Sequence, residues 1–224
     1  MTVILAGRNR EKTHAWLVAD TLTSGHGHVF RTDVDRKIVR CGPGLLGCAG
    51  AAAGCDRIQL ILPKLLRKER RVSRELLYAV MAGAELLDDL TSEVEFVFAQ
   101  PTGILYGSGK ALLTVNGLVA GVGCGAPVAM AYVAGRAKPV SLASLKAGVA
   151  YAIKHVDGCG GRITAMTARR KPRTRTASTP TKSAPAPEKG AATPGTDPGA
   201  NTQTKKQTKK RAKKRTKHRR GTDC

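Results

Sequence analysis

Large apolar residues stop at Met166, and this confines any folded core to the part of the chain before it. Residues 167–224 contain no Leu, Ile, Val, Phe, Tyr or Trp. A segment without such side chains has nothing to bury that would oppose the conformational entropy lost on folding. We therefore expect one folded domain over residues 1–167, followed by a disordered C-terminal tail.

The tail carries most of the positive charge of the chain. Residues 168–224 hold 18 Lys and Arg against 3 Asp and Glu, which accounts for +15 of the formal net charge of +22. Residues 168–204 are rich in Pro, Ala, Thr and Gly, a composition typical of a disordered linker. Residues 205–224 are rich in Lys and Arg and form a basic tail.

The basic tail predicts binding of nucleic acid or another polyanion, because clustered Lys and Arg side chains displace counterions from a phosphate backbone. Such binding depends steeply on salt and reads no base sequence. The alternative is a solvated tail that only improves solubility. The residues expected to bind a polyanion are Lys205, Lys206, Lys209, Lys210, Arg211, Lys213, Lys214 and Arg215.

The six cysteines are expected to be free thiols. No apolar segment typical of a secretory signal precedes them, so we expect a cytoplasmic protein in a reducing compartment. Cys41, Cys48 and Cys55 follow one another at intervals of seven residues, which fits no usual metal-ligand spacing. We expect neither a metal nor another cofactor.

One uncharged stretch, residues 111–135, has the length of a membrane span. Five glycines interrupt it, and a strand, a Gly-rich turn and the start of a buried helix explain the run better. We therefore expect no association with a membrane.

Hydrophobic periodicity changes along the core, and the order of the changes predicts the fold class. Apolar runs and alternation predict strands over 2–8, 14–23, 28–42, 44–51, 93–99, 103–109, 111–117, 118–123 and 161–167. Apolar residues three and four apart predict helices over 52–66, 73–90, 126–137 and 141–156, with Ser73 as an N-cap. Pairs of helices between blocks of strands favour antiparallel sheets covered by helices. We expect an α+β fold, a four-layer αββα sandwich.

The first residues, "MTVILAG", place a threonine directly behind the initiator methionine. In most proteins such a threonine only opens a β-strand. Removal of Met1 would instead leave a hydroxyl and a free α-amine on Thr2, which together supply a nucleophile and a base. An α-amine has a reference pKa of about 7.7 to 8.0, so it is partly neutral at physiological pH and able to take the hydroxyl proton.

Such a site also needs a cation beside the amine, an acid that fixes the cation, and a main-chain donor for the oxyanion. Asp20 ends the second predicted strand, and Lys37 stands in "DVDRKIVR". Gly50 lies where a strand gives way to a helix, and a glycine there leaves its N–H open to a bound carbonyl. Each residue alone is ordinary, but their joint placement with Thr2 indicates a catalytic site.

Six motifs follow one another along the chain in an order and at a spacing that match a known family. They are "TVILAGR", "VADTLTSG", "RKIVR", "GCAGAAAG", "GVGCGAPVA" and "HVDGCGG". Together they resemble the catalytic core of proteasome β-subunits and of their bacterial relative, the ring peptidase HslV, which are N-terminal nucleophile (Ntn) hydrolases. The resemblance covers residues 2–167. It implies that Thr2 is the nucleophile, Lys37 the catalytic lysine and Asp20 its acidic partner. It also implies that Gly50 supplies the oxyanion N–H and that Asp157 is a second supporting acid.

Two positions depart from the family pattern. The family usually has a serine between two glycines before its third helix, whereas this chain has Cys124 between Gly123 and Gly125. A thiol is a weaker hydrogen-bonding group than a hydroxyl, so proton transfer at Thr2 would be slowed or differently tuned. The serine usual shortly after the Asp157 position is replaced by Gly160.

Five further positions are candidates for binding a substrate. Cys48 and Ala52 flank Gly50 and would leave room for a sizeable apolar side chain, whereas Asp35 would favour a basic one. The other two candidates lie in the second motif and are Thr23 and Ser24.

The resemblance implies a threonine-type endopeptidase that degrades unfolded proteins. It further implies a homo-oligomeric ring, protein or peptide substrates, and an ATP-dependent unfoldase as partner, since this chain has no nucleotide site of its own. The alternative is a catalytically weakened shell protein whose basic tail binds nucleic acid or an acidic partner. A third reading is a small-molecule amidohydrolase of the same fold family.

Overall fold

A computed structural model describes residues 2–22, 37–88, 94–108, 111–136 and 139–170, all within one unit of residues 1–174. The described residues form two antiparallel sheets. The four-stranded sheet has the order β8 (Val119–Val122), β1 (Ile4–Arg8), β2 (His14–Asp20), β9 (Ile163–Arg169). The five-stranded sheet has the order β3 (Ile38–Cys41), β4 (Gly44–Gly50), β5 (Val94–Gln100), β6 (Gly103–Ser108), β7 (Ala111–Val115).

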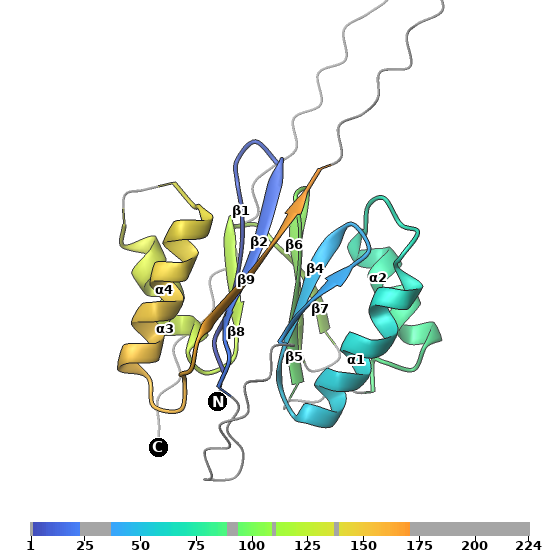
Figure 1. Cartoon of the computed structure of the whole chain (residues 1–224). Helices are drawn as coiled ribbons and strands as arrows, with labels where there is room; N and C mark the ends of the chain where they lie inside the picture. The colour runs from blue at the N-terminus through green and yellow to red at the C-terminus, as the bar shows by residue number, and fades with distance from the viewer. Residues whose placement is uncertain (1, 23–36, 89–93, 109–110, 137–138, 171–224) are drawn as a thin grey trace, which may run out of the picture. The chain divides into compact units, whose positions relative to one another are not determined.

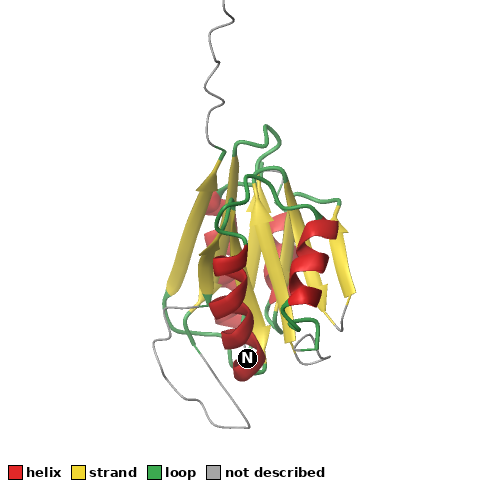
Figure 2. Ribbon diagram, turned by 90° about the vertical axis from the view of Figure 1, so that its right-hand side faces the viewer, coloured by secondary structure: helices red, strands yellow, loops and turns green. Residues whose placement is uncertain are grey.

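Each sheet is covered on its outer face by a pair of helices (Figure 1). The pair α3 (Ala126–Ala134) and α4 (Leu142–His155) packs on the four-stranded sheet. The pair α1 (Ala52–Leu65) and α2 (Arg74–Gly83) packs on the five-stranded sheet. Figure 2 shows the second pair lying in front of the strands. The α+β fold with four αββα layers, predicted from the order of the elements, is confirmed.

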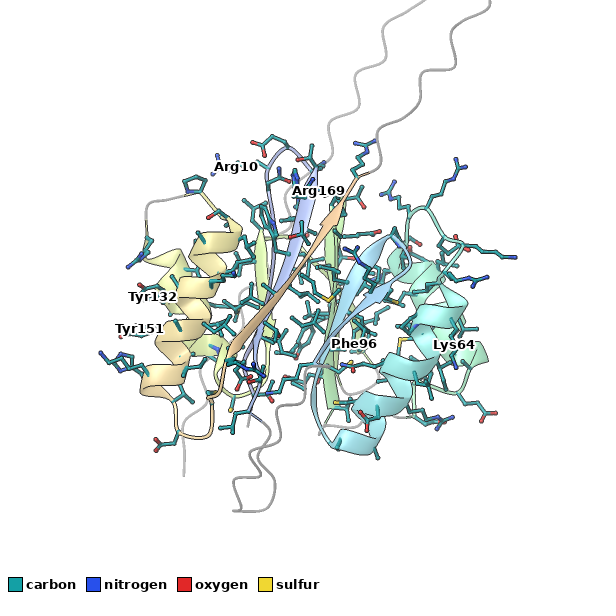
Figure 3. All side chains as sticks on the ribbon, in the orientation of Figure 1. Arg10, Lys64, Phe96, Tyr132, Tyr151 and Arg169 are labelled. Carbon is teal, nitrogen blue, oxygen red and sulfur yellow. The ribbon has the colours of Figure 1, made fainter. Side chains whose placement is uncertain are left out.

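Three apolar layers hold these elements together, one between the sheets and one under each helix pair. Phe96, labelled in Figure 3, is fully buried in the layer between the five-stranded sheet and its helices. The layer between the sheets contains many small side chains, among them Ala6, Ala19, Ala49 and Ala99. Small side chains let the two sheets approach closely, and this brings polar groups at the sheet ends within hydrogen-bonding distance of one another.

The N-terminus of α2 follows the sequence prediction, whereas its C-terminus does not. Ser73 caps the helix by accepting a hydrogen bond from the Leu76 amide at 3.1 Å, as predicted. The helix was expected to reach residue 90, but it ends at Gly83. Glu85 takes a left-handed conformation with φ of 56°, and the Leu86 amide bonds back to the Met81 carbonyl. This Schellman-type turn ends the helix although the apolar spacing continues.

Other boundaries differ by a few residues, as frayed ends of elements usually do. The strand predicted over 28–42 is described only from Ile38 to Cys41, and the part of that prediction over 28–36 lies outside the described residues. The last strand continues to Arg169, and the amide of Arg170 donates to the carbonyl of Thr13. The main-chain hydrogen bonds of the core therefore extend past residue 167.

The uncharged stretch over 111–135 is divided among β7, β8 and α3. Within the described ranges, none of the helices combines the length and the apolar character that crossing a membrane requires.

The close contact between the sheets leaves no space for a larger side chain at Gly47. A Cβ atom on Gly47 would lie 2.9 Å from Ile4 Cγ2 of the facing sheet. Gly47→Val should therefore lower the free energy of unfolding by ~1–3 kcal/mol through overpacking, seen as a fall in Tm of several degrees. Gly103→Ala is the control, because nothing lies within 4 Å of its Cβ position. Equal Tm values for the two variants would contradict this packing.

Candidate active site

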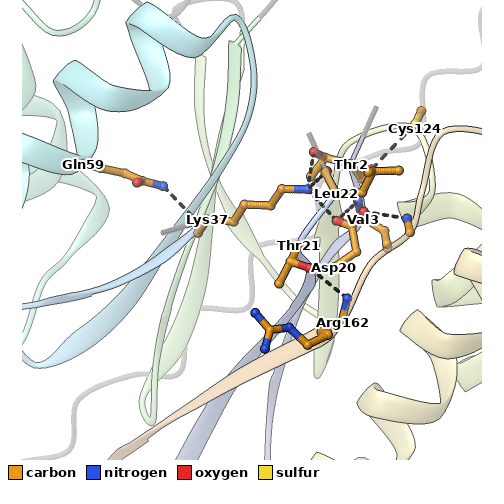
Figure 4. Close-up of polar contacts among 10 residues, drawn as sticks. Thr2, Val3, Asp20, Thr21, Leu22, Lys37, Gln59, Cys124 and Arg162 are labelled. Carbon is orange, nitrogen blue, oxygen red and sulfur yellow. Dashed lines mark hydrogen bonds and ion pairs between the residues drawn. The ribbon is translucent and has the colours of Figure 1, made fainter. Parts of the chain in front are cut away.

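Three segments meet where the N-terminal end of β1 lies beside the C-terminal end of β2 (Figure 4). The antiparallel register pairs Ile4 with Ala19, so Thr2 and Asp20 are brought to the same end of the sheet. Lys37 reaches them from the other sheet, directly before β3. The sequence therefore places these side chains through strand register and sheet stacking, although they are far apart along the chain.

Lys37 uses all three donors of its ammonium group. Its Nζ lies 2.9 Å from Thr2 Oγ1 and 2.8 Å from Asp20 Oδ1, and it also donates to the carbonyl of Leu22. The side chain is 8% exposed, and its own main-chain carbonyl accepts from Gln59 Nε2 at 3.1 Å. A buried ammonium with every donor satisfied has one fixed position, and that position is against the Thr2 hydroxyl.

Asp20 is fully buried and both of its carboxylate oxygens are occupied. Oδ1 accepts from the Val3 amide at 3.0 Å and from Lys37 Nζ, while Oδ2 accepts from the Gly160 amide at 3.1 Å. A buried charge is tolerated when it is paired and hydrogen-bonded in this way. Asp20 thus ties the start of β1, the lysine and the turn before β9 together.

The carbonyl of Thr2 contacts the turn between β8 and α3. The Gly125 amide donates to it at 3.2 Å, and Cys124 Sγ lies 3.7 Å from it. Gly123 has φ of +86°, and a Cβ atom there would come within 2.4 Å of the same oxygen. Glycine is required at this position both for the backbone conformation and for the close approach.

Cys124 is exposed, and next to it lies the buried thiol of Cys159. Burial raises the pKa of Cys159 to about 12, and the neighbouring Cys124 and Asp20 add to the shift. Cys159 therefore stays a neutral thiol at physiological pH and adds no negative charge next to Cys124 and Asp20. Cys124 occupies the position at which the family pattern has its serine, and its contact goes to the Thr2 carbonyl.

Gly50 ends β4 with φ of +115° and is exposed. The next residue, Ala51, caps α1 without any side-chain hydrogen bond. The first main-chain N–H groups of a helix have no partner within the helix, and they are common donors for an anion. Since Ile38 pairs with Gly47, the junction lies at the same end of the five-stranded sheet as Lys37.

The other candidates are not brought together with Thr2. Asp157 lies in an exposed turn after α4, and its carboxylate makes no hydrogen bond or ion pair with the described part of the chain. Cys48 is buried, and its thiol faces Cys55 and Gln59 of α1 rather than an open surface. Ala52 is exposed at the start of α1. Three further candidates, Thr23, Ser24 and Asp35, lie outside the described residues. The basic residues of the tail also lie outside them.

Burial raises the pKa of the Cys48 thiol, and its hydrogen bond with Cys55 lowers the pKa of the Cys55 thiol. In the described ranges, the His, Cys, Asp and Glu side chains form no group of three or more that could hold a metal ion.

The main-chain groups that complete the site were not predicted from the sequence. The Leu22 carbonyl accepts from Lys37, the Gly160 amide donates to Asp20, and the Gly125 amide donates to Thr2. A main-chain group carries no residue type, so only the glycines of "GCGAP" and "GCGG" could have indicated that the backbone approaches closely there.

No protein-family model matches the chain, and no curated protein matches its sequence. BPH from Thiobacillus denitrificans, solved in complex with epoxomicin, matches with a TM-score of 0.61 and 20% identity, over 76% of this chain and 100% of that one. Eukaryotic HslV from Trypanosoma brucei matches with a TM-score of 0.60 and 13% identity, over 75% of this chain and 99% of that one. The chain therefore has the fold of HslV-type structures, and the resemblance carried by its sequence motifs is confirmed at the level of the fold.

Proposed function

We propose that this protein is a threonine-type endopeptidase whose nucleophile is Thr2, exposed by removal of Met1. The observation that carries the proposal is the position of Lys37. Its Nζ lies 2.9 Å from Thr2 Oγ1 and 2.8 Å from the buried carboxylate of Asp20. A buried lysine held against a hydroxyl stabilises negative charge that develops on that oxygen. Its own positive charge also disfavours protonation of a free Thr2 amine, so the amine remains available as a base.

In the proposed reaction, Thr2 Oγ1 attacks the carbonyl carbon of a peptide bond while its proton passes to the Thr2 α-amine. A carbon–oxygen bond forms, and the carbonyl electrons move onto the oxygen. The amine then gives the proton to the leaving nitrogen as the carbon–nitrogen bond breaks, which leaves an ester on Thr2. The same amine takes a proton from water while the water oxygen bonds to the ester carbon. The bond from that carbon to Thr2 Oγ1 then breaks, the carboxylic acid product leaves, and the amine returns the proton to Oγ1.

The oxyanion of this reaction would be bound by the Gly50 N–H at the junction of β4 and α1. The positive φ of Gly50 and the absence of a side-chain cap at Ala51 support this assignment. Such preorganised main-chain donors typically contribute about 10²–10³-fold to kcat. Cys124 would act beside the nucleophile, and Asp157 would be a more distant support.

The wider assignments rest on the family resemblance. We propose a homo-oligomeric ring that accepts unfolded protein or peptide substrates from an ATP-dependent unfoldase in the cytoplasm. Substrate contacts are proposed for Ala52 and for three residues outside the described ranges, Thr23, Ser24 and Asp35, whereas Cys48 is buried against α1.

The first experiment is intact-protein mass spectrometry with and without a peptide epoxyketone such as epoxomicin. The reagent bonds to both the hydroxyl and the free amine of an N-terminal threonine. We expect a chain that has lost Met1 and gains one adduct, and Thr2→Ala should take none. Thr114→Ala, which removes an exposed threonine on β7, should react as the wild type does. Retained Met1, or a processed chain without adduct, would count against the proposal.

Replacing the thiol of Cys124 gives a second test. A serine hydroxyl is a stronger hydrogen-bonding group than a thiol, which here stands 3.7 Å from the Thr2 carbonyl. Cys124→Ser should raise kcat for a fluorogenic peptide by about three- to tenfold, the equivalent of the ~0.5–1.5 kcal/mol that one hydrogen bond contributes. Cys41→Ala removes a buried thiol elsewhere and should leave kcat unchanged. A Cys124→Ser variant with unchanged or lower kcat would argue against a role for this side chain in proton transfer.

A second candidate function is favoured by the charge of residues 168–224, which hold 18 Lys and Arg against 3 Asp and Glu. In this proposal the tail binds nucleic acid or an acidic partner, and the folded unit is a weakened shell. Many copies of one tail on a ring would bind a polyanion by avidity.

Deletion of residues 175–224 distinguishes the two functions, because it leaves the unit of residues 1–174 whole. Binding to a fluorescein-labelled DNA duplex should weaken with rising salt in the full chain and disappear on deletion. Peptidase activity should survive the deletion. Salt-dependent DNA binding by the shortened chain would show that the tail is not the binding element.

A further inference from the structure

A second polar connection joins the two sheets at the candidate active site, and it involves a residue that the proposed reaction does not use. Glu95 lies on β5 of the five-stranded sheet and is half-buried. Its Oε2 accepts from the Gly123 amide at 3.2 Å, in the turn that follows β8 of the four-stranded sheet. Its Oε1 accepts from the hydroxyl of Tyr106 at 2.6 Å.

The position of Glu95 is unusual for a carboxylate. Side chains alternate along a strand, so Glu95 shares its face with Val97 and Ala99, which belong to the apolar layer between the sheets. Burying part of a charged group on such a face is unfavourable unless hydrogen bonds compensate for the lost water. An apolar residue would pack there without this cost, so the packing of the fold does not account for the choice of glutamate.

Tyr106 fixes the direction of the carboxylate. It pairs with Val97 on the neighbouring strand, which makes it a diagonal neighbour of Glu95 on the same face. Burial, together with the bond to Glu95, raises the pKa of the Tyr106 hydroxyl. The hydroxyl is therefore neutral at physiological pH and donates a hydrogen bond to Oε1, which leaves Oε2 for Gly123.

Gly123 transmits this connection to the nucleophile. A Cβ atom on Gly123 would stand 2.4 Å from the Thr2 carbonyl oxygen, so the backbone of the turn is in contact with Thr2. The Gly125 amide, two residues further on, donates to that same oxygen. A shift of the turn would therefore move Thr2.

Glu95 is also connected to the proposed oxyanion donor. In the register of β4 and β5, Ala49 pairs with Glu95 and Gly50 pairs with Val94. The main chain of Glu95 thus runs beside the junction that carries Gly50, while its side chain holds the turn around Thr2. Glu95 therefore contacts both the turn around Thr2 and the strand that ends at Gly50. The proposed reaction depends on the distance between Thr2 and Gly50.

We propose that Glu95, oriented by Tyr106, is a positioning residue that sets the separation between Thr2 and the Gly50 N–H by holding the Gly123 turn. The inference rests on the proposed peptidase function. Glu95 itself touches no reacting atom. Its effect comes from geometry, because a misplacement of ~1 Å between reacting groups lowers a rate by about 10²-fold.

The test compares kcat and KM for a fluorogenic peptide in four variants. Glu95→Ala should lower kcat at least about tenfold, with KM changing less than about threefold, since binding does not require the turn to be held. Tyr106→Phe should lower kcat by a smaller factor, because the carboxylate keeps its bond to Gly123. Glu95→Gln should recover most of the loss, because its amide oxygen can accept from Gly123 while its NH₂ group donates to the Tyr106 oxygen.

Gln100→Ala is the matched control. Gln100 is a buried polar residue on the same strand, and it bonds the main chain of Val72, away from Thr2. This variant should lower Tm and leave kcat unchanged. If it lowers kcat as much as Glu95→Ala does, general destabilisation of β5 is the cause and the inference is overturned.

Hydrogen exchange measured by mass spectrometry gives a readout that does not depend on turnover. The peptide that contains Gly123 should exchange faster in Glu95→Ala than in the wild type, and the wild-type rate should return in Glu95→Gln. Unchanged exchange, or equal losses of kcat in the alanine and glutamine variants, would overturn the inference. If the wild type is active and Glu95→Ala has an unchanged kcat, only the role of Glu95 is refuted and the proposed function stands. A wild type that neither turns over peptide nor takes the epoxyketone refutes the proposed function, and the role of Glu95 with it.

Discussion

The buried ion pair between Asp20 and Lys37 is the interaction on which the rest of the site depends. It joins the two sheets, since Asp20 ends β2 in one and Lys37 precedes β3 in the other. Removing either partner would leave an unpaired charge in a site that is almost closed to water. The remaining donors and acceptors of the pair are bound to Thr2, Leu22, Val3 and Gly160, so the pair also fixes their relative positions.

This arrangement is possible because the sheets lie close together. Alanines fill much of the layer between them, and Gly47 leaves space for Ile4 of the facing sheet. Larger side chains would separate the sheets and lengthen the contacts of about 3 Å that cross between them. The packing of the core and the geometry of the site therefore have the same cause, since both follow from small residues on the two inner faces.

Two connections with different chemistry cross between the sheets beside Thr2. Lys37 brings a positive charge to the Thr2 hydroxyl, and Glu95 holds the turn that contacts the Thr2 carbonyl. The first bears on the electrostatics of the proposed nucleophile and the second on its position. Cys124 lies in that turn, so one of the two positions at which this chain departs from the family pattern is held by the same contacts.

The sequence by itself determined the order of strands and helices, because periods of two and of three to four residues can be read along the chain. It also indicated Thr2, Asp20 and Lys37, since their side-chain types at these positions fit one reaction. The end of α2 was missed because Leu86 and Leu87 continue the apolar spacing, while the left-handed turn at Glu85 depends on the backbone. Only the tertiary structure decided which groups complete the site. The Gly160 amide and Asp20 are 140 residues apart, and Glu95 meets Gly123 through stacking of the two sheets, so neither contact leaves a local pattern in the sequence.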